Sequence, residues 1–146
     1  MNTTDKFDLK RFLDAQDEVY EIAFAELRAG QKRTHWMWFI FPQIDGLAMS
    51  ATSRHYAIKS LDEAQVYLAH PLLGSRLIEC SRTLVALHDR SASQILGYPD
   101  DLKLKSSMTL FSLLDNADPV FEAVLDKYFD GERDKRTILI TGLMDA

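Results

Sequence analysis

Apolar residues recur at helical spacing along most of this chain. The clearest stretch runs from residue 9 to residue 27, where they stand at Leu9, Phe12, Leu13, Val19, Tyr20, Ala23, Phe24 and Leu27. Steps of three and four residues place such side chains in one stripe along an amphipathic helix. The pattern returns in 71–88 and in 119–129. Stripes of this kind are buried by packing helix against helix, so the sequence predicts an all-α protein.

Capping signals mark where these helices begin and end. Ser60 with Glu63 and Ser91 with Gln94 have the spacing of capping boxes. Glycines at the ends of the stripes are typical C-caps, and Pro71 suits the first position of a helix. A short helix is predicted to start near Ser53. The longer predicted helices are 9–27, 60–69, 71–88, 91–97, 100–114 and 118–131.

The stretch TILIT, 137–141, is rich in β-branched residues and is the one candidate strand. It has no obvious pairing partner, so a short C-terminal helix or an extended tail is favoured instead. We therefore predict one all-α domain over 1–146, with six to eight helices, some short, and an irregular loop region around 30–60.

Composition excludes several classes of protein. No apolar run approaches the roughly 18 residues of a membrane span, and the opening MNTTDKFDLKRF lacks the apolar core of a secretory signal. A lone cysteine, Cys80, cannot form an internal disulfide, and it lies on an apolar stripe, which indicates a buried thiol in a cytoplasmic protein. A net charge of −5 argues against binding to extended nucleic acid, although basic residues in GQKRTH leave a small anionic ligand possible. The four histidines lack ligand spacing, so we predict neither a metal nor a cofactor; the oligomeric state stays open.

The segment HWMWFIFPQ, 35–43, carries both tryptophans of the chain. A Gly-led turn brings Lys32, Arg33 and His35 directly into it. One interpretation is a core helix with a solvated basic flank; the other is the apolar wall of a pocket with polar groups at its rim. Trp36 and Trp38 are two residues apart and cannot both face one core from a helix, so one of them is expected to meet a second surface.

A second candidate is KLKSSMTLF, 103–111, where Ser106, Ser107 and Thr109 gather inside a predicted helix. Hydroxyls lower helix propensity because they compete for backbone hydrogen bonds. They either pack against a close neighbour or bind a sugar or phosphate oxygen. Lys103 and Ser107 are four residues apart and share a face.

Two carboxylates of the helical segments are further candidates. Glu63 is explained by capping, or else it faces a groove together with Tyr56 and Tyr67. Gln16 and Glu26 interrupt or end the first stripe, and each would need a partner if buried; Lys32 or Arg33 would serve Glu26.

The motifs HWMWFIFPQ, YAI…EA…YLAHPLLGSRL and DDLKLKSSMTLF resemble a bacterial family of small proteins of unknown function, domain of unknown function 1810, sometimes labelled calpastatin. The resemblance runs from residue 15 to Thr137 and implies a mainly helical single domain without an established activity. The chain departs from the family in having Ala48 where members usually have glycine, which questions a role for glycine conformation there. A calpastatin-like inhibitor would be a disordered repeat chain, unlike this pattern.

A more distant similarity, in the order EA…LG, a Lys-bearing helix and a late L…T helix, links the chain to small helical domains that act on NAD and ADP-ribose derivatives. That similarity implies aromatics around a base or nicotinamide ring and Lys or hydroxyl groups on phosphates. It also implies a Glu that stabilises an oxocarbenium-like charge or activates water, and a Lys that attacks the opened sugar.

Two functions follow. The first is a cleft for an NAD- or ADP-ribose-type ligand, in which the protein could also hydrolyse an N-glycosidic or ADP-ribosyl bond. The candidate catalytic residues are Lys32, Glu63 and Lys103. The candidate ligand contacts are His35, Trp36, Trp38, Gln43, Tyr56, Ser106 and Ser107. The second is a non-enzymatic interaction module that docks a partner on an exposed segment 35–43. Whether the protein is an enzyme is left open by the sequence.

Overall fold

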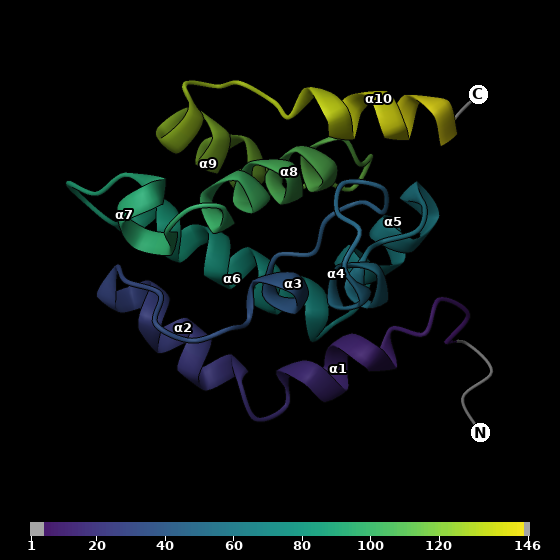
Figure 1. The fold of residues 1–146 in the computed structure, drawn as a ribbon, viewed down its shortest axis with the longest axis horizontal. Coiled ribbons are helices and arrows are strands. Elements are labelled where there is room, and N and C mark those ends of the chain that lie inside the picture. Colours follow the sequence, from purple (N-terminus) through teal and green to yellow (C-terminus); the bar gives the residue numbers. More distant parts are fainter. Residues whose placement is uncertain (1–4, 145–146) are drawn as a thin grey trace.

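Ten helices form the fold over residues 5–144, the part of the chain that the computed structural model describes (Figure 1). The bounds are α1 Lys10–Gln16, α2 Tyr20–Ala29, α3 Met37–Ile40, α4 Ala51–Tyr56, α5 Leu61–Ala69, α6 Leu73–Ala86, α7 Ala92–Leu96, α8 Asp100–Ser112, α9 Val120–Phe129 and α10 Lys135–Met144. No strand forms between residues 5 and 144, so the all-α prediction is confirmed, whereas six to eight helices was too few. Residues 1–4, in the opening discussed for a secretory signal, and residues 145–146, in the predicted C-terminal helix or tail, lie outside the described residues.

The helices are arranged in layers around α6 and α8 (Figure 1). Helix α6 packs against α2, α5 and α9, and α8 packs against α5, α7, α9 and α10. In the view of Figure 1, α9 and α10 lie above this central pair and α1 and α2 lie below it. None of the helices described is both long and apolar enough to cross a membrane.

One hydrophobic core joins these layers, and the aromatic segment contributes heavily to it. Its largest fully buried side chains are Trp36, Tyr67, Phe12, Phe41, Phe111 and Phe121. Rings from α1, α5, α8 and α9 meet in sequence through tilted and edge-on contacts, as between Tyr67 and Phe111 at 5.6 Å. The short α3 joins the same core through the buried side chains of Met37, Phe39 and Ile40.

The single helix predicted over 9–27 is wrong at its middle, because the chain turns between α1 and α2. Gln16, the last residue of α1, is buried, and its amide donates to the carbonyl of Phe39 at 2.7 Å and to the hydroxyl of Tyr67 at 3.2 Å. Its amide oxygen accepts from Arg76 at 3.2 Å. These long-range bonds direct α1 toward α3 and α5, which a straight continuation into α2 would not allow.

Most predicted caps are confirmed, with small corrections. Ser91 and Gln94 form a complete capping box, and Gly30 ends α2 in the left-handed conformation. Ser60 caps α5, but the return bond of Glu63 goes to the backbone N–H of Lys59, outside the box. The short helix α4 begins at residue 51 and is capped by Ser50, earlier than predicted, and TILIT lies within α10 as the helical alternative had it. Helix α6 begins two residues after Pro71, and the imidazole of His70 accepts the N–H groups of Leu72 and Leu73 there.

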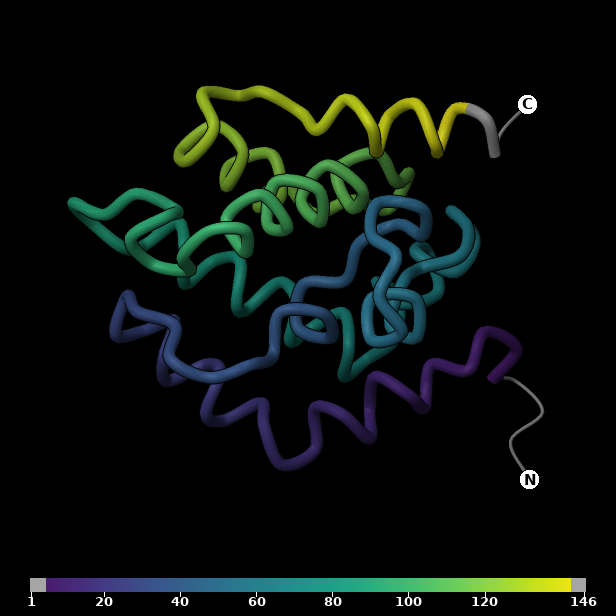
Figure 2. The backbone as a smooth tube through the Cα atoms, in the orientation of Figure 1, coloured from purple at the N-terminus to yellow at the C-terminus, as the bar shows by residue number. Residues whose placement is uncertain are grey.

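The irregular stretch between α3 and α5 is shaped by a few backbone bonds (Figure 2). Ile44 and Ile58 form an isolated parallel bridge, with Ile58 N–H donating to the carbonyl of Gln43 at 2.8 Å. Gly46 turns the chain with φ +103°, and its carbonyl accepts from Arg136 at the start of α10. The required positive φ falls on Gly46, so Ala48 meets no conformational conflict.

Candidate functional site

A small pocket opens between α3, α4 and the loop that joins them. Its cavity is about 20 Å³, or about 290 Å³ when the open mouth is included, and it is lined by Trp38, Gln43, Ile44, Gly46, Leu47, Ala48, Ser53, Tyr56 and Ala57. Three candidate ligand contacts, Trp38, Gln43 and Tyr56, thus meet in one place. Apolar walls with a few polar groups are the usual makeup of a small-molecule site.

The two tryptophans face different surroundings, as their spacing predicted. Trp36 is fully buried, and its indole N–H donates to Glu26 at 2.8 Å. Trp38 is only partly buried and forms a wall of the pocket. The ammonium of Lys103 lies 4.8 Å from the centroid of the Trp38 ring. Trp38 is therefore the tryptophan available to a ligand.

Two polar groups of the pocket have no hydrogen-bond partner in the part of the chain that the structure describes. Across residues 5–144, neither the side-chain amide of Gln43 nor the hydroxyl of Tyr56 makes a hydrogen bond to another residue. Both side chains are partly exposed, so water satisfies them in the free protein. A ligand with complementary donors and acceptors can replace that water.

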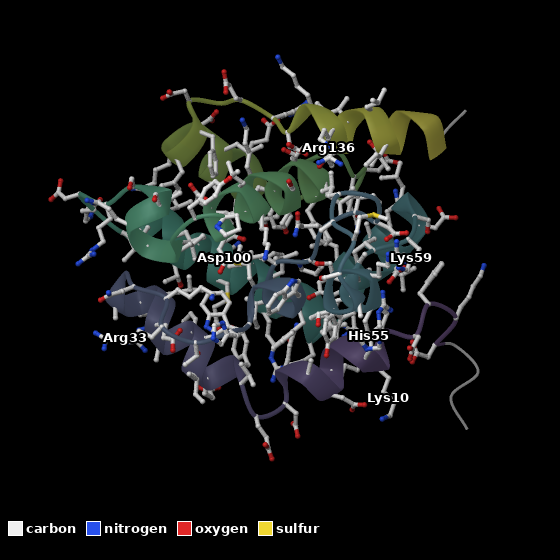
Figure 3. The ribbon with its side chains drawn as sticks, in the orientation of Figure 1. Lys10, Arg33, His55, Lys59, Asp100 and Arg136 are labelled. Atoms are coloured by element: carbon white, nitrogen blue, oxygen red, sulfur yellow. The ribbon has the colours of Figure 1, made fainter. Side chains whose placement is uncertain are left out.

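Lys32 and Lys103 are joined through one carboxylate at the start of α8. Lys32 Nζ lies 2.9 Å from Oδ2 of Asp100, and Lys103 Nζ lies 3.2 Å from its Oδ1. The side-chain exposures are 9% for Lys32, 18% for Asp100 and 20% for Lys103, so the cluster is sheltered. Figure 3 labels Asp100 near the centre of the molecule, whereas Arg33 and Lys10 stand at its edges.

Glu63 is placed away from the pocket lining, in a sealed environment. It is 1% exposed, and its Oε2 accepts from Arg11 at 2.6 Å while Oε1 accepts from the N–H of Lys59 at 2.9 Å. Arg11 also donates to the carbonyls of His55 and Ala57. The pair therefore ties α1 to the turn between α4 and α5, directly behind the pocket.

The hydroxyl cluster of α8 is mostly satisfied by its own helix. Ser106 donates to the carbonyl of Leu102, and Thr109 donates to that of Lys105 while accepting the N–H of Asp134. Ser107 is fully buried, and its hydroxyl is a buried side-chain group without a hydrogen-bond partner among the described residues. None of the three lines the pocket.

The remaining candidates divide between core and solvent. His35 is exposed and lies outside the pocket lining. Most of segment 35–43 is buried, with only Trp38 and Gln43 partly exposed beside His35. The exposed apolar patch that partner docking would require is therefore not formed by this segment.

Cys80 is buried, as its position on the stripe predicted, and burial raises the pKa of its thiol to about 12. A thiol in that state is a poor nucleophile. Between residues 5 and 144 no three His, Cys, Asp or Glu side chains gather in a way that could hold a metal ion.

Several site residues escaped prediction. Ser53 and the loop residues Ile44, Gly46 and Leu47 line the pocket because the parallel bridge folds their loop against α4. Asp100 was expected only to start a helix. No local pattern marks either case, since both depend on contacts between segments far apart in the chain.

The fold and the pocket define a small all-helical protein with an aromatic-walled site. The chain belongs to the family described as protein of unknown function (DUF1810), whose model matches residues 6–141. It is similar to the conserved hypothetical protein Rv1873 from Mycobacterium tuberculosis, known from a crystal structure, with 52% identity and a TM-score of 0.93. The similarity covers 94% of this chain and 99% of that one. No curated protein matches the chain.

Proposed function

We propose that this protein binds a small nucleotide-like ligand, with one planar ring of the ligand lying over the mouth of the Trp38 pocket. The observation that carries the proposal is the meeting of an accessible indole with two polar groups, on Gln43 and Tyr56, that have no hydrogen-bond partner among residues 5–144. A planar ring gains stacking and apolar contact from Trp38 and Tyr56. The amide of Gln43 offers both a donor and an acceptor, which suits the edge of a base or of nicotinamide.

The size of the pocket limits what enters it. The cavity itself, about 20 Å³, is far smaller than the roughly 300–1,000 Å³ of ligand pockets, so it does not enclose a ring. A whole dinucleotide exceeds that space. An NAD- or ADP-ribose-type ligand would therefore lay one ring over the mouth of the pocket and extend its remaining groups along the surface beside Trp38.

Binding without hydrolysis is the form of this function that the geometry supports best. Cleavage of an N-glycosidic or ADP-ribosyl bond needs a carboxylate near the sugar. Glu63 is sealed behind the pocket by Arg11 and Lys59. Asp45, whose neighbours Ile44 and Gly46 line the pocket, is partly exposed and pairs with Lys59 at 3.5 Å, although it does not itself line the pocket. Hydrolysis is tested by product analysis of wild type against Asp45→Asn.

The two-tryptophan composition makes a site-specific binding test possible. A ¹⁵N-correlated NMR spectrum has two indole N–H signals, one for each tryptophan. Nicotinamide, adenosine, AMP, ADP-ribose and NAD are titrated to millimolar concentration. We expect the Trp38 signal to shift saturably while the signal of Trp36, held by Glu26, stays in place.

Variants assign the effect to the pocket. Gln43→Ala and Tyr56→Phe should weaken binding, each by about tenfold if one hydrogen bond worth about 1.4 kcal/mol is lost. Gln31→Ala serves as a control because Gln31 is exposed and outside the pocket. If no ligand moves the Trp38 signal, or if both indole signals move equally, the proposed pocket is not the binding site.

A further inference from the structure

We infer that Lys32 and Lys103 form an anion subsite beside the Trp38 pocket, which Asp100 occupies in the free protein, so that the ligand is a planar ring carrying a phosphate or carboxylate. This inference rests on the proposed function for the ring and adds the charged half of the ligand. Its residues are Lys32 from the loop after α2, and Asp100 and Lys103 from the first turn of α8.

The charge count of the cluster leaves an excess cation. Two ammonium groups share the two oxygens of one carboxylate, one oxygen each. Two further carboxylates lie nearby but form no ion pair with these lysines: Glu26 accepts the N–H groups of Arg33, Thr34 and the Trp36 indole, and Asp101 accepts the N–H of Leu102. Charged side chains at such low exposure are normally paired. An incoming anion would complete the pairing of the second lysine.

Hydrogen-bond donors are also left over. An ammonium has three N–H donors. Across the described residues, the ammonium groups of Lys32 and Lys103 form ion pairs with Asp100 and otherwise lie over aromatic rings, Lys32 at 5.2 Å from Trp36 and Lys103 at 4.8 Å from Trp38. Rings accept no conventional hydrogen bond. Each lysine therefore keeps donors that phosphate or carboxylate oxygens can use.

The subsite adjoins the ring pocket through a shared side chain. Trp38 forms the pocket wall and also lies under the ammonium of Lys103. A ligand whose ring contacts Trp38 from the pocket would bring an attached anionic group to the lysines. The ion cluster could instead serve to attach the loop after α2 to α8. That explanation is weaker, because the backbone N–H of Lys32 already fixes this loop by donating to the carbonyl of Ile95 at 2.7 Å.

Asp100 then competes with the ligand anion for the two lysines. A ligand anion must share the lysines with this carboxylate or displace it, and like charges close together repel. Removing the negative charge of Asp100 should consequently raise affinity for anions, whereas removing the charge of Lys103 should lower it. A purely structural ion cluster gives a different result, since both changes would alter stability and neither would alter anion affinity.

The first test uses inorganic phosphate and acetate alone, followed by the Trp38 indole signal in NMR titrations of the full chain. We expect a saturable shift in wild type, an apparent affinity at least about fivefold higher in Asp100→Asn, and loss of the shift in Lys103→Met and Lys32→Met. Lys10→Met is the matched control, because Lys10 is an exposed lysine paired with Asp14 far from the site. Asp100→Ser replaces Asp100→Asn if the latter does not fold.

The second test compares ligands that differ only in the anionic group. AMP should bind at least about tenfold more tightly than adenosine, and nicotinate more tightly than nicotinamide, with both preferences lost in Lys103→Met. The stronger preference of the two pairs identifies phosphate or carboxylate as the natural group. Equal binding within both pairs, with no phosphate shift in Asp100→Asn, overturns the subsite while the ring pocket stands. Absence of any ring binding overturns the proposed function, and the phosphate titration still decides the subsite separately.

Discussion

The indole N–H of Trp36 donates to Oε1 of Glu26 at 2.8 Å, and this one carboxylate organises the whole turn before α3. The same carboxylate accepts the backbone N–H groups of Arg33 and Thr34 and the hydroxyl of Thr34. Trp36 is thereby fixed in the core, which leaves Trp38 to face the pocket. A carboxylate on α2 thus sets the orientation of the aromatic segment.

Replacing Glu26 with Gln should lower the free energy of unfolding by about 1–2 kcal/mol, because charge-assisted hydrogen bonds to the turn are weakened. Urea denaturation measures the change. Glu21→Gln, an exposed carboxylate on the same helix, is the control and should have little effect. A loss no larger than that of the control would show that the turn forms without Glu26.

The effect of Glu26 should also depend on pH. Burial raises the pKa of this carboxyl, but the hydrogen bonds from Arg33, Trp36 and Thr34 outweigh it and lower the pKa below 4.5. A lowered folded-state pKa means that the stabilisation is present above the unfolded-state pKa and is lost as pH falls through the folded value. The stability difference between wild type and Glu26→Gln should therefore shrink when denaturation is repeated below pH 4.5. A difference that stays constant on acidification would contradict this assignment.

The buried pair of Arg11 and Glu63 should be costly to break. Glu63→Gln is expected to lower the free energy of unfolding by about 3–5 kcal/mol, since it leaves the guanidinium without its counter-charge. Asp62→Asn, at the exposed neighbouring position, is the matched control. In the double variant Arg11→Met with Glu63→Leu, the loss of unfolding free energy should be smaller than the sum of the losses in Arg11→Met alone and Glu63→Leu alone. Additive losses would mean that the two groups act independently.

Gly74 is required by the close approach of α6 to the end of α5. A Cβ added there would lie 1.9 Å from the backbone carbonyl oxygen of Leu68, whereas one added at Gly142 in α10 meets nothing within 4 Å. Gly74→Ala should cost at least about 3 kcal/mol or prevent folding, because backbone must move. Gly142→Ala should be neutral or add up to about 1 kcal/mol of helix propensity. Thermal and urea unfolding of the two variants measure the effect of the same glycine-to-alanine change at a crowded and at an open helix position.

Cys80 should be unreactive in the folded protein. Burial raises the pKa of its thiol to about 12, so thiolate is scarce near pH 8 and reagent is excluded. A disulfide reagent should label native protein only at the rate of unfolding and unfolded protein at once. Because the unfolded thiol ionises near pH 9.0 while the folded thiol does not, the free energy of unfolding should fall as pH rises above that value. Rapid native labelling would show that α6 opens locally.

Local signals were sufficient for most of the secondary structure. The stripes that end at Gly30 and begin after Ser60 and Ser91 became helices, because spacing and capping act within a few residues. These local signals gave a wrong prediction where a helix residue bonds to residues far away in the sequence. Gln16 binds Phe39 and Tyr67, so the predicted first helix became two.

The candidate site shows the same division. The two-residue spacing of Trp36 and Trp38 required different environments for them, but which one faced the core depended on Glu26, ten residues before Trp36. Gln43 and Tyr56 meet at one pocket because Ile44 pairs with Ile58.

By itself, the sequence determined the helical class, the caps and the segments able to carry chemistry, since periodicity and composition are local properties. Tertiary structure alone decided that Glu63 is sealed by Arg11 and that Asp100 joins Lys32 to Lys103. The physical reason is that burial and charge pairing depend on which distant segments pack together.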